Sequence, residues 1–221
     1  KKRVQPFILR RTKKDVLKEL PEKMEEIYYC KMDGPQEEIY QTYIEKIKND
    51  LSAGGNQILA LITRLRQICL SPKLIFDDDL PSAKLNLALE LITRAIASNH
   101  RILIFSQFAS VFPIVSSMLT MENIPHFCID GKTSAQKRID LVEEFNKNLN
   151  IKVFLISLKA GGTGLNLTGA DMVIHLDPWW NVSAEHQATD RAHRIGQTRK
   201  VHVLKLVCMD SIEEKVMLLQ H

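Results

Sequence analysis

The stretch KVFLISLKAGGTGLNLTGADMVIHLDPWWN, residues 152–181, decides the fold class of this chain. It holds two short apolar runs, KVFLIS (152–157) and MVIHL (172–176), of the length expected for strands that are buried on both faces. Further runs of this kind are RILIFS (101–106), IPHFCI (124–129) and VHVLKLV (201–207). Helical patterns separate most of these runs, and this alternation predicts an α/β fold, a parallel sheet covered by helices on both faces.

Apolar residues at helical spacing mark the helices in this half of the chain. They recur over 83–98 and 110–121, and Thr133 with Gln136 fits a capping box for a third helix. Ser211 is expected to cap a last helix. Ligands of such sheets bind at the carboxyl ends of the strands, so we expect the functional loops directly after the apolar runs.

The chain before residue 80 has a different, mainly helical pattern. A first helix is expected to begin near Pro35, and a second is expected over 58–68. The segment EEIYYCKM (25–32) is β-rich and is a candidate strand. With 221 residues the chain is long enough for one large domain, or for one domain with a helical subdomain.

Composition excludes several classes of protein. Hydrophobic residues make up 45% and charged residues 25%, which is typical of a globular domain. No apolar run approaches the roughly 18 residues of a membrane span and no signal peptide opens the chain, so we expect an intracellular protein without a membrane partner. The first residue is Lys rather than Met, which indicates a fragment of something longer. The net charge of +4 permits a polyanionic partner without demanding one.

The cysteines of the chain are far apart in sequence. They are Cys30, Cys69, Cys128 and Cys208, with no C-x-x-C pair or Cys/His cluster among them. Each has apolar neighbours. We therefore expect four buried, reduced thiols and no zinc or other metal site.

The segment QATDRAHRIGQTRKV (187–201) concentrates charge. We expect it to be helical, with Ser183 as its N-cap and Gly196 as its stop. The residues that then share one face are Gln187, Arg191 and Arg194. Two guanidiniums on one face suit a polyphosphate, because each donates in a planar fork that matches phosphate oxygens. The alternative is a surface helix with ordinary ion pairs.

Two polar loops follow predicted strands. The glycines of SLKAGGTGLNL (157–167) let the backbone approach a ligand, and exposed N–H groups in such a turn bind anions; the alternative is a tight turn without a ligand. Ser106 and Gln107 end another strand, where a polar helix cap is the alternative to a ligand contact. Trp179 and Trp180 are expected to pack in the core or between domains. The phosphate-binding sequence G-x-x-x-x-G-K-[ST] is absent from the chain.

Several blocks of sequence occur in series. They are FILRRTKKDVLKELPEK (7–23), LRQICLSPKL (65–74), RILIFSQF (101–108), SLKAGGTGLNLTGADMVIHLDPWWN (157–181) and DRAHRIGQTRKVHVLKLV (190–207). Together they resemble the C-terminal, second ATPase lobe of Swi/Snf-type double-stranded-DNA translocases in helicase superfamily two, and DPWWN favours a prokaryotic member. The resemblance implies a RecA-like lobe with a small helical subdomain at its N-terminal side.

The resemblance also implies roles for single residues. Arg191 and Arg194 would be arginine fingers that reach ATP bound on the other lobe, with Gln187 as the glutamine of the same motif. A nucleotide contact is implied for Gly162 as well. The implied DNA contacts are Ser106, Gln107, Lys159, Gly162, Thr163 and Asn166. ATP and Mg²⁺ would be cofactors of the full-length enzyme, bound mainly by a first lobe that supplies the P-loop lysine and the magnesium-binding acids, and none is expected in this fragment.

This interpretation divides the chain into three parts. Residues 1–21 would be a basic connector from the first lobe, residues 22–81 a helical insertion, and residues 82–221 the second lobe with motifs IV, V and VI. The expected partners are double-stranded DNA and the first lobe of the same chain, and the fragment is expected to be monomeric and inactive alone. It would lie in the cytoplasm or nucleoid of a prokaryote, or in a nucleus.

Two other functions remain open on the sequence. A superfamily-two helicase that separates strands is disfavoured by the LRRTKKDV block and by the IGQT ending of motif VI. A non-catalytic nucleic-acid-binding module is disfavoured only if a P-loop and an acid pair lie upstream in the full gene.

Overall fold

The computed structural model describes residues 21–52, 58–76, 80–158 and 164–220. Within them the strands form one parallel sheet of order β1-β6-β5-β2-β4-β3. The strands are β1 (Lys23–Cys30), β2 (Ile102–Ser106), β3 (His126–Ile129), β4 (Val153–Ser157), β5 (Met172–His175) and β6 (Val201–Cys208). The predicted α/β fold is confirmed, and each apolar run of the second half is a strand.

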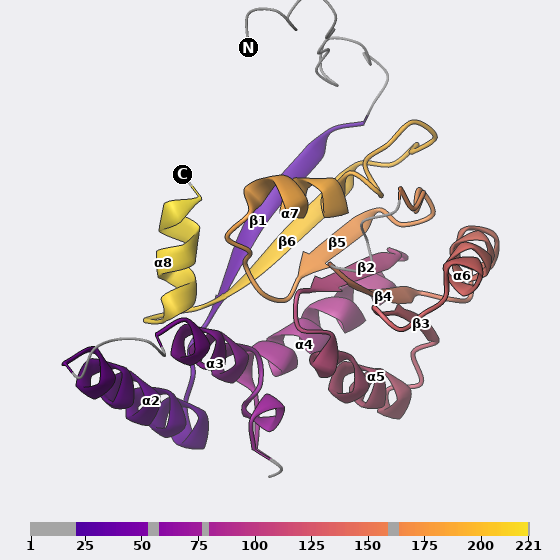
Figure 1. Ribbon diagram of the computed structural model, residues 1–221. Helices are drawn as coiled ribbons and strands as arrows, with labels where there is room; N and C mark the ends of the chain where they lie inside the picture. Colours follow the sequence, from indigo (N-terminus) through magenta and orange to yellow (C-terminus); the bar gives the residue numbers. More distant parts are fainter. Residues whose placement is uncertain (1–20, 53–57, 77–79, 159–163, 221) are drawn as a thin grey trace, which may run out of the picture.

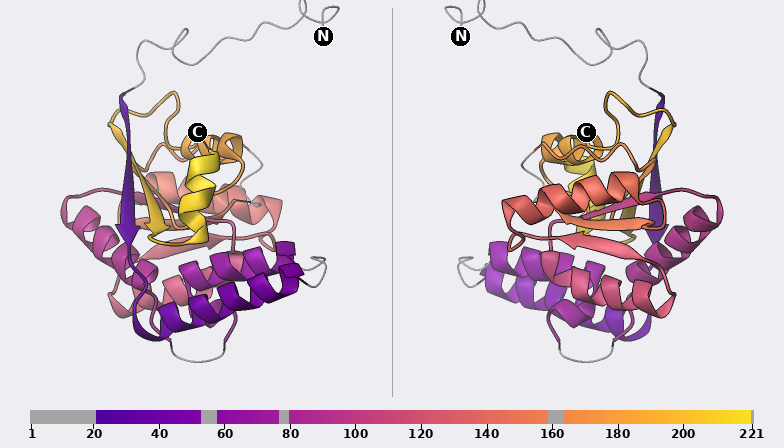
Figure 2. Two further views of the ribbon diagram at one scale, coloured as in Figure 1. Left: turned by 90° about the vertical axis from the view of Figure 1, so that its left-hand side faces the viewer. Right: turned by 90° about the vertical axis from the view of Figure 1, so that its right-hand side faces the viewer.

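Helices cover both faces of this sheet (Figures 1 and 2). They are α2 (Gly34–Ser52), α3 (Ile58–Leu70), α4 (Ala83–Ala97), α5 (Phe112–Met121), α6 (Ala135–Lys147), α7 (Val182–Thr189) and α8 (Ile212–Leu219), with short 3₁₀ turns at Pro72–Leu74 and Ala109–Val111. Among these residues no helix is both long and apolar enough to cross a membrane.

Alternation along the strands sends neighbouring side chains to opposite faces. Ile102 and Ile104 pack with α4 and α5, whereas Leu103 and Phe105 pack with α6 and with Ala188 of α7. A third apolar cluster joins α2 and α3 to the ends of β1 and β6. The central strands are therefore buried on both sides, which explains their continuous apolar sequence.

Strand β1 differs from the expected layout. It lies inside the range 22–81 that the sequence assigned to a helical insertion, yet it pairs with β6 from Lys23 opposite Val201 to Cys30 opposite Cys208. As an edge strand it keeps charged side chains exposed, which limits pairing with other chains. The sheet therefore begins before the helices α2 and α3, and the division of the chain into three parts stays a proposal.

The helix caps agree only in part with expectation. Ser211 caps α8 as predicted, because its hydroxyl accepts a hydrogen bond from the N–H of Glu213 at 3.1 Å. Helix α6 is capped by Ser134 rather than Thr133, whose hydroxyl instead donates to Asp130 within the preceding turn. The prediction was one residue early because Thr133 and Ser134 are both good caps.

Candidate functional site

The segment with the arginines is not a single helix. Helix α7 is capped by Asn181, not Ser183, and it ends at Thr189. Gln187 therefore lies on the helix and is exposed, while Arg191 and Arg194 lie in the turns that follow. The predicted helical face carrying all three side chains is wrong.

Competing hydrogen bonds explain why the helix ends. The carbonyl of Arg191 accepts from the N–H of Leu167 at 3.0 Å, and that of Ala192 accepts from the N–H of Arg194 and the side chain of Gln197. In a continuing helix both carbonyls would serve the next turn. Gly196 has a φ of 99°, which favours glycine, so it ends the turn rather than the helix.

Gln197 holds this turn in place. Its Nε2 donates to the carbonyls of Thr168, Ala170 and Ala192 at 3.3, 2.7 and 3.2 Å, and its Oε1 accepts from two backbone N–H groups that follow. The segment after the glycine loop and the turn with the arginines are thus joined. Gln197 was not predicted as a functional or structural residue, although it lies within the block DRAHRIGQTRKVHVLKLV (190–207) that carries the resemblance.

Arg191 is a buried cation without a hydrogen-bonded anion. Arg191 is 9% exposed, and its Nε and Nη1 have no hydrogen-bond partner among the described residues. The guanidinium lies over the ring of Phe105, with Cζ 5.9 Å from the ring centroid. Burial lowers its pKa to about 10, so it is still charged at neutral pH. Unsatisfied buried donors are costly, and their directed N–H groups suit an anionic ligand.

Arg194 has the opposite environment. Its side chain is exposed, three residues along the same turn. The turn therefore presents one guanidinium that the fold restrains and one that solvent surrounds.

Ser106 and Gln107 lie at the carboxyl end of β2, against the loop that follows β5. The hydroxyl of buried Ser106 donates to Asp177 Oδ1 at 2.5 Å, and the N–H of Gln107 donates to the same carboxylate. Burial raises the pKa of Asp177, while the hydrogen bond from Ser106 and the nearby charge of Arg66 oppose that rise. The Ser106 hydroxyl is thus occupied within the fold, whereas Gln107 Nε2 has no hydrogen-bond partner among the described residues.

Arg66 of α3 connects the helical part to these strand ends. Its Nη2 donates to the carbonyl of Pro178 at 2.6 Å and lies 3.7 Å from Asp177 Oδ2. Its guanidinium lies 5.5 Å from the ring centroid of Phe108 and 5.6 Å from that of Trp180. Neither Arg66 nor Asp177 was predicted as a site residue, because neither stands out in the sequence from its apolar or turn-forming neighbours.

The remaining predicted residues divide into two groups. Lys159, Gly162 and Thr163 lie outside the described residues. Asn166 is exposed, and its backbone carbonyl accepts from Asn146 Nδ2 at 2.8 Å. Trp179 packs against the core as expected, while Trp180 is 43% exposed.

Buried polar groups connect α7 to the sheet. Glu185 pairs with Lys205 of β6 and accepts from the N–H of Trp179. His175 stacks on Phe105, and its Nε2 lies 3.1 Å from the hydroxyl of Thr189. Burial lowers the pKa of His175 to about 4, so the ring is neutral at pH 7.

Comparison with known proteins gives a consistent result. The profile of the family described as "Helicase conserved C-terminal domain" matches residues 83–196, and that of the "SNF2-related domain" matches residues 1–74. An ATP-dependent helicase of Mycoplasma pneumoniae is 42% identical over 97% of this chain, which covers 21% of that protein. Nuclear protein STH1/NPS1 of Saccharomyces cerevisiae is 35% identical over 97% of this chain, covering 17% of it. The chain thus spans about a fifth of the length of such curated relatives.

Solved structures show the same architecture. The Sulfolobus solfataricus SWI2/SNF2 ATPase core in complex with dsDNA superposes with a TM-score of 0.79 at 34% identity, over 97% of this chain and 47% of that one. The C-terminal part of the Fun30 ATPase domain superposes with a TM-score of 0.81 at 25% identity, over 91% of this chain and 90% of that one.

Proposed function

Because the chain belongs to the helicase C-terminal domain family and to its Snf2-type members, we propose that it is the second lobe of an ATP-dependent motor that moves along double-stranded DNA. The observation that carries this proposal is the guanidinium of Arg191, which is buried and has two nitrogens without hydrogen-bond partners in the part of the chain that the structure describes. A charged fork held in this way is matched by a phosphate that arrives from outside the chain.

Under this proposal ATP and Mg²⁺ are bound mainly by a first lobe, because the present sequence has no P-loop motif. Arg191 and Arg194 would contact the γ-phosphate when the two lobes close, and Gln187 and Gly162 would lie beside it. The bound nucleotide supplies the phosphoryl group that is transferred to water. The arginines would stabilise the negative charge that develops on that group.

DNA would be held through its phosphates rather than through its bases. The proposed contacts are Gln107 and Ser106 at the end of β2, and Lys159, Gly162, Thr163 and Asn166 of the glycine loop and its exit. The S. solfataricus relative, solved in complex with dsDNA, supports this choice of ligand. Phosphate contacts carry little sequence information, so binding would depend strongly on salt and weakly on base composition.

Arg194 gives the test of the nucleotide role, since it is exposed and its loss leaves the core intact. In a protein that joins this chain to its first lobe, Arg194→Ala should reduce DNA-stimulated kcat by on the order of a thousandfold. Arg194→Lys should restore little, because an ammonium cannot reproduce the fork. The matched control is Arg94→Ala on α4, another exposed arginine, which forms an ion pair with Glu90 in the preceding turn of the same helix. Near-normal turnover in Arg194→Ala would remove the arginine-finger assignment.

A strand-separating helicase is the rival function. The two are distinguished by substrate: a duplex translocase displaces a third strand from a triplex without separating the duplex beneath it. Separation of a plain duplex at the same rate as triplex displacement would favour the rival. A non-catalytic DNA-binding module would show no ATP-dependent displacement in either assay.

A further inference from the structure

Three cysteines that the sequence separates are brought together by the sheet. Cys30 and Cys208 end β1 and β6 and face each other in the parallel register, with their sulfurs 3.5 Å apart. Cys69 comes from the last turn of α3, and Cys208 Sγ lies 3.2 Å from its carbonyl. All three residues are buried. The absence of a C-x-x-C pattern therefore says nothing about how close these thiols are.

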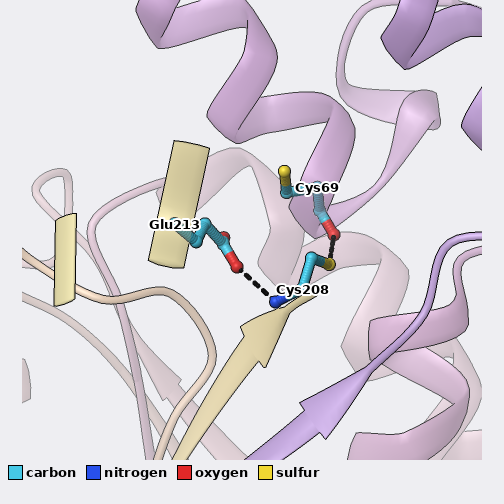
Figure 3. A group of neighbouring side chains, drawn as sticks. All are labelled: Cys69, Cys208 and Glu213. Carbon is cyan, nitrogen blue, oxygen red and sulfur yellow. Dashed lines mark hydrogen bonds between the residues drawn. The ribbon is translucent and has the colours of Figure 1, made fainter. Parts of the chain in front are cut away.

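A carboxylate completes the cluster from a fourth element. Glu213, in the first turn of α8, is fully buried, and one of its oxygens lies within 4.8 Å of both Cys69 Sγ and Cys208 Sγ. Figure 3 shows Cys69, Cys208 and Glu213, which come from α3, the end of β6 and α8; the Cys208 sulfur lies beside the Cys69 carbonyl, and the Cys208 N–H donates to Glu213. In a tetrahedral zinc site the ligand atoms lie ~3.5–3.8 Å apart. The three ligand atoms here lie within 4.8 Å of one another, so binding an ion requires them to close in by no more than about 1 Å.

The two carboxylate oxygens of Glu213 differ in their hydrogen bonds. Its Oε2 accepts from the ammonium of Lys84 and from the N–H of Cys208. Its Oε1 is buried and has no hydrogen-bond partner among the described residues. A buried oxygen in that condition is unusual in a folded protein, and a bound ion is one recognised explanation.

Charge also balances around such an ion. Two thiolates and one carboxylate carry three negative charges. A divalent cation together with Lys84, which is fully buried against Glu213, carries three positive charges. Buried charges are tolerated when they are paired in this way. Thiolate ligands select zinc over magnesium or calcium.

We propose that Cys69, Cys208 and Glu213 bind one Zn²⁺ ion. The ion would tie the helices α3 and α8 to the end of β6. Such a site is structural, because its ligands are closed to solvent, and it lies away from the arginine turn. It is independent of the proposed motor function.

The competing account is a cluster of three neutral thiols. Burial raises the pKa of Cys69, and Cys30 Sγ lies 3.7 Å from the carbonyl of Val207, which is the geometry of a weak thiol donor. In that account the sulfurs only fill space. A disulfide between Cys30 and Cys208 is the other alternative.

The experiment uses the chain purified without a metal-affinity tag. Its zinc content is measured by elemental analysis, and the metal-free chain is titrated with Zn²⁺ against a chromophoric chelator. We expect about one zinc per chain with a sub-micromolar Kd, within the range of structural zinc sites. Cobalt substitution should give the absorption of a tetrahedral thiolate site, a readout that needs no variant.

The variants are Cys208→Ser and Cys69→Ser, each expected to weaken zinc binding at least a hundredfold. The matched control is Cys128→Ser, whose exposed thiol on β3 lies outside the cluster and should leave binding unchanged. Circular dichroism confirms that each variant folds. The proposal is wrong if the wild-type chain takes up no zinc at micromolar concentration, or if Cys208→Ser and Cys128→Ser bind it equally. An intact mass two hydrogens too low would assign the disulfide instead.

Discussion

Arg66 and Arg191 are both buried arginines, and they differ in what surrounds them. Arg66 has a carbonyl, a carboxylate and two aromatic rings, and among its buried nitrogens Nε alone lacks a hydrogen-bond partner within the described residues. Arg191 lies over one aromatic ring, and two of its buried nitrogens lack hydrogen-bond partners among the described residues. A buried cation that the fold satisfies holds the fold together. One that the fold leaves unsatisfied is explained more readily by a ligand that arrives from elsewhere.

The largest expected effect is on turnover through Arg191. In the two-lobe protein, Arg191→Met should lower DNA-stimulated kcat by on the order of a thousandfold or more, because the buried guanidinium that the fold holds in place no longer reaches the transferring phosphoryl group. The free energy of unfolding of the chain should stay the same or rise, since the change removes an unsatisfied buried charge. Steady-state ATPase and urea unfolding measure the two quantities. A large loss of stability with normal kcat would mean that Arg191, like Arg66, stabilises the fold and does not contact the nucleotide.

Arg66 should show the reverse pattern. Arg66→Met leaves the carboxylate of Asp177 buried without its cation, and breaking such a pair costs about 3–5 kcal/mol of unfolding free energy. Urea unfolding of the isolated chain measures this. The matched control is Arg64→Met, two residues earlier on α3 and exposed, which should change stability by less than about 1 kcal/mol. Equal changes in unfolding free energy for Arg66→Met and Arg64→Met would show that the ion pair between Arg66 and Asp177 does not stabilise the fold.

His175 tests whether the polar groups beneath α7 stabilise the fold. Its folded pKa of about 4 lies below the usual unfolded value, so the unfolded state binds the proton first as pH falls. Stability is then lost between roughly pH 6.5 and 4, amounting to ~2 kcal/mol at pH 5. His175→Gln keeps a donor toward Thr189 without the titration. Its unfolding free energy should therefore fall less between pH 7 and pH 5. Identical slopes in the two proteins would contradict the pKa assignment.

The sequence predicted what depends on local pattern. Continuous apolar runs identified β2, β4 and β5, because a strand buried on both faces needs apolar side chains at every position. The end of α7 was missed because it depends on Leu167 and Gln197, which capture carbonyls from a distant part of the chain. The segment of β1 was recognised as a candidate strand from its β-rich sequence, whereas its place beside β6 was missed because pairing with a distant part of the chain decides it.

The candidate site was predicted by residue type but not by geometry. The charge of Arg191 was visible in the sequence, whereas its burial follows from packing against Phe105. The expectation of four buried cysteines failed at Cys128, which alternation on β3 places at an exposed position. The sequence also could not show that three other cysteines meet, because strand register decides that.

The smallest expected effect is on DNA affinity, and it distinguishes the roles of the adjacent residues Ser106 and Gln107 at the end of β2. The hydroxyl of Ser106 is already bonded to Asp177, whereas Gln107 Nε2 has no partner among the described residues, so Gln107 is the better placed to donate to a DNA phosphate. Gln107→Ala should weaken binding of duplex DNA a few-fold, about 1 kcal/mol for one hydrogen bond, and equally for different sequences. Ser106→Ala should instead lower the free energy of unfolding by about 1–2 kcal/mol, because the buried carboxylate loses a donor, and it should weaken DNA binding less than Gln107→Ala does. Fluorescence anisotropy at several salt concentrations measures the affinities, and both variants should keep the steep salt dependence of phosphate contacts. A larger loss of affinity in Ser106→Ala than in Gln107→Ala would reverse the assignment, and would mean that the hydroxyl exchanges Asp177 for the DNA backbone.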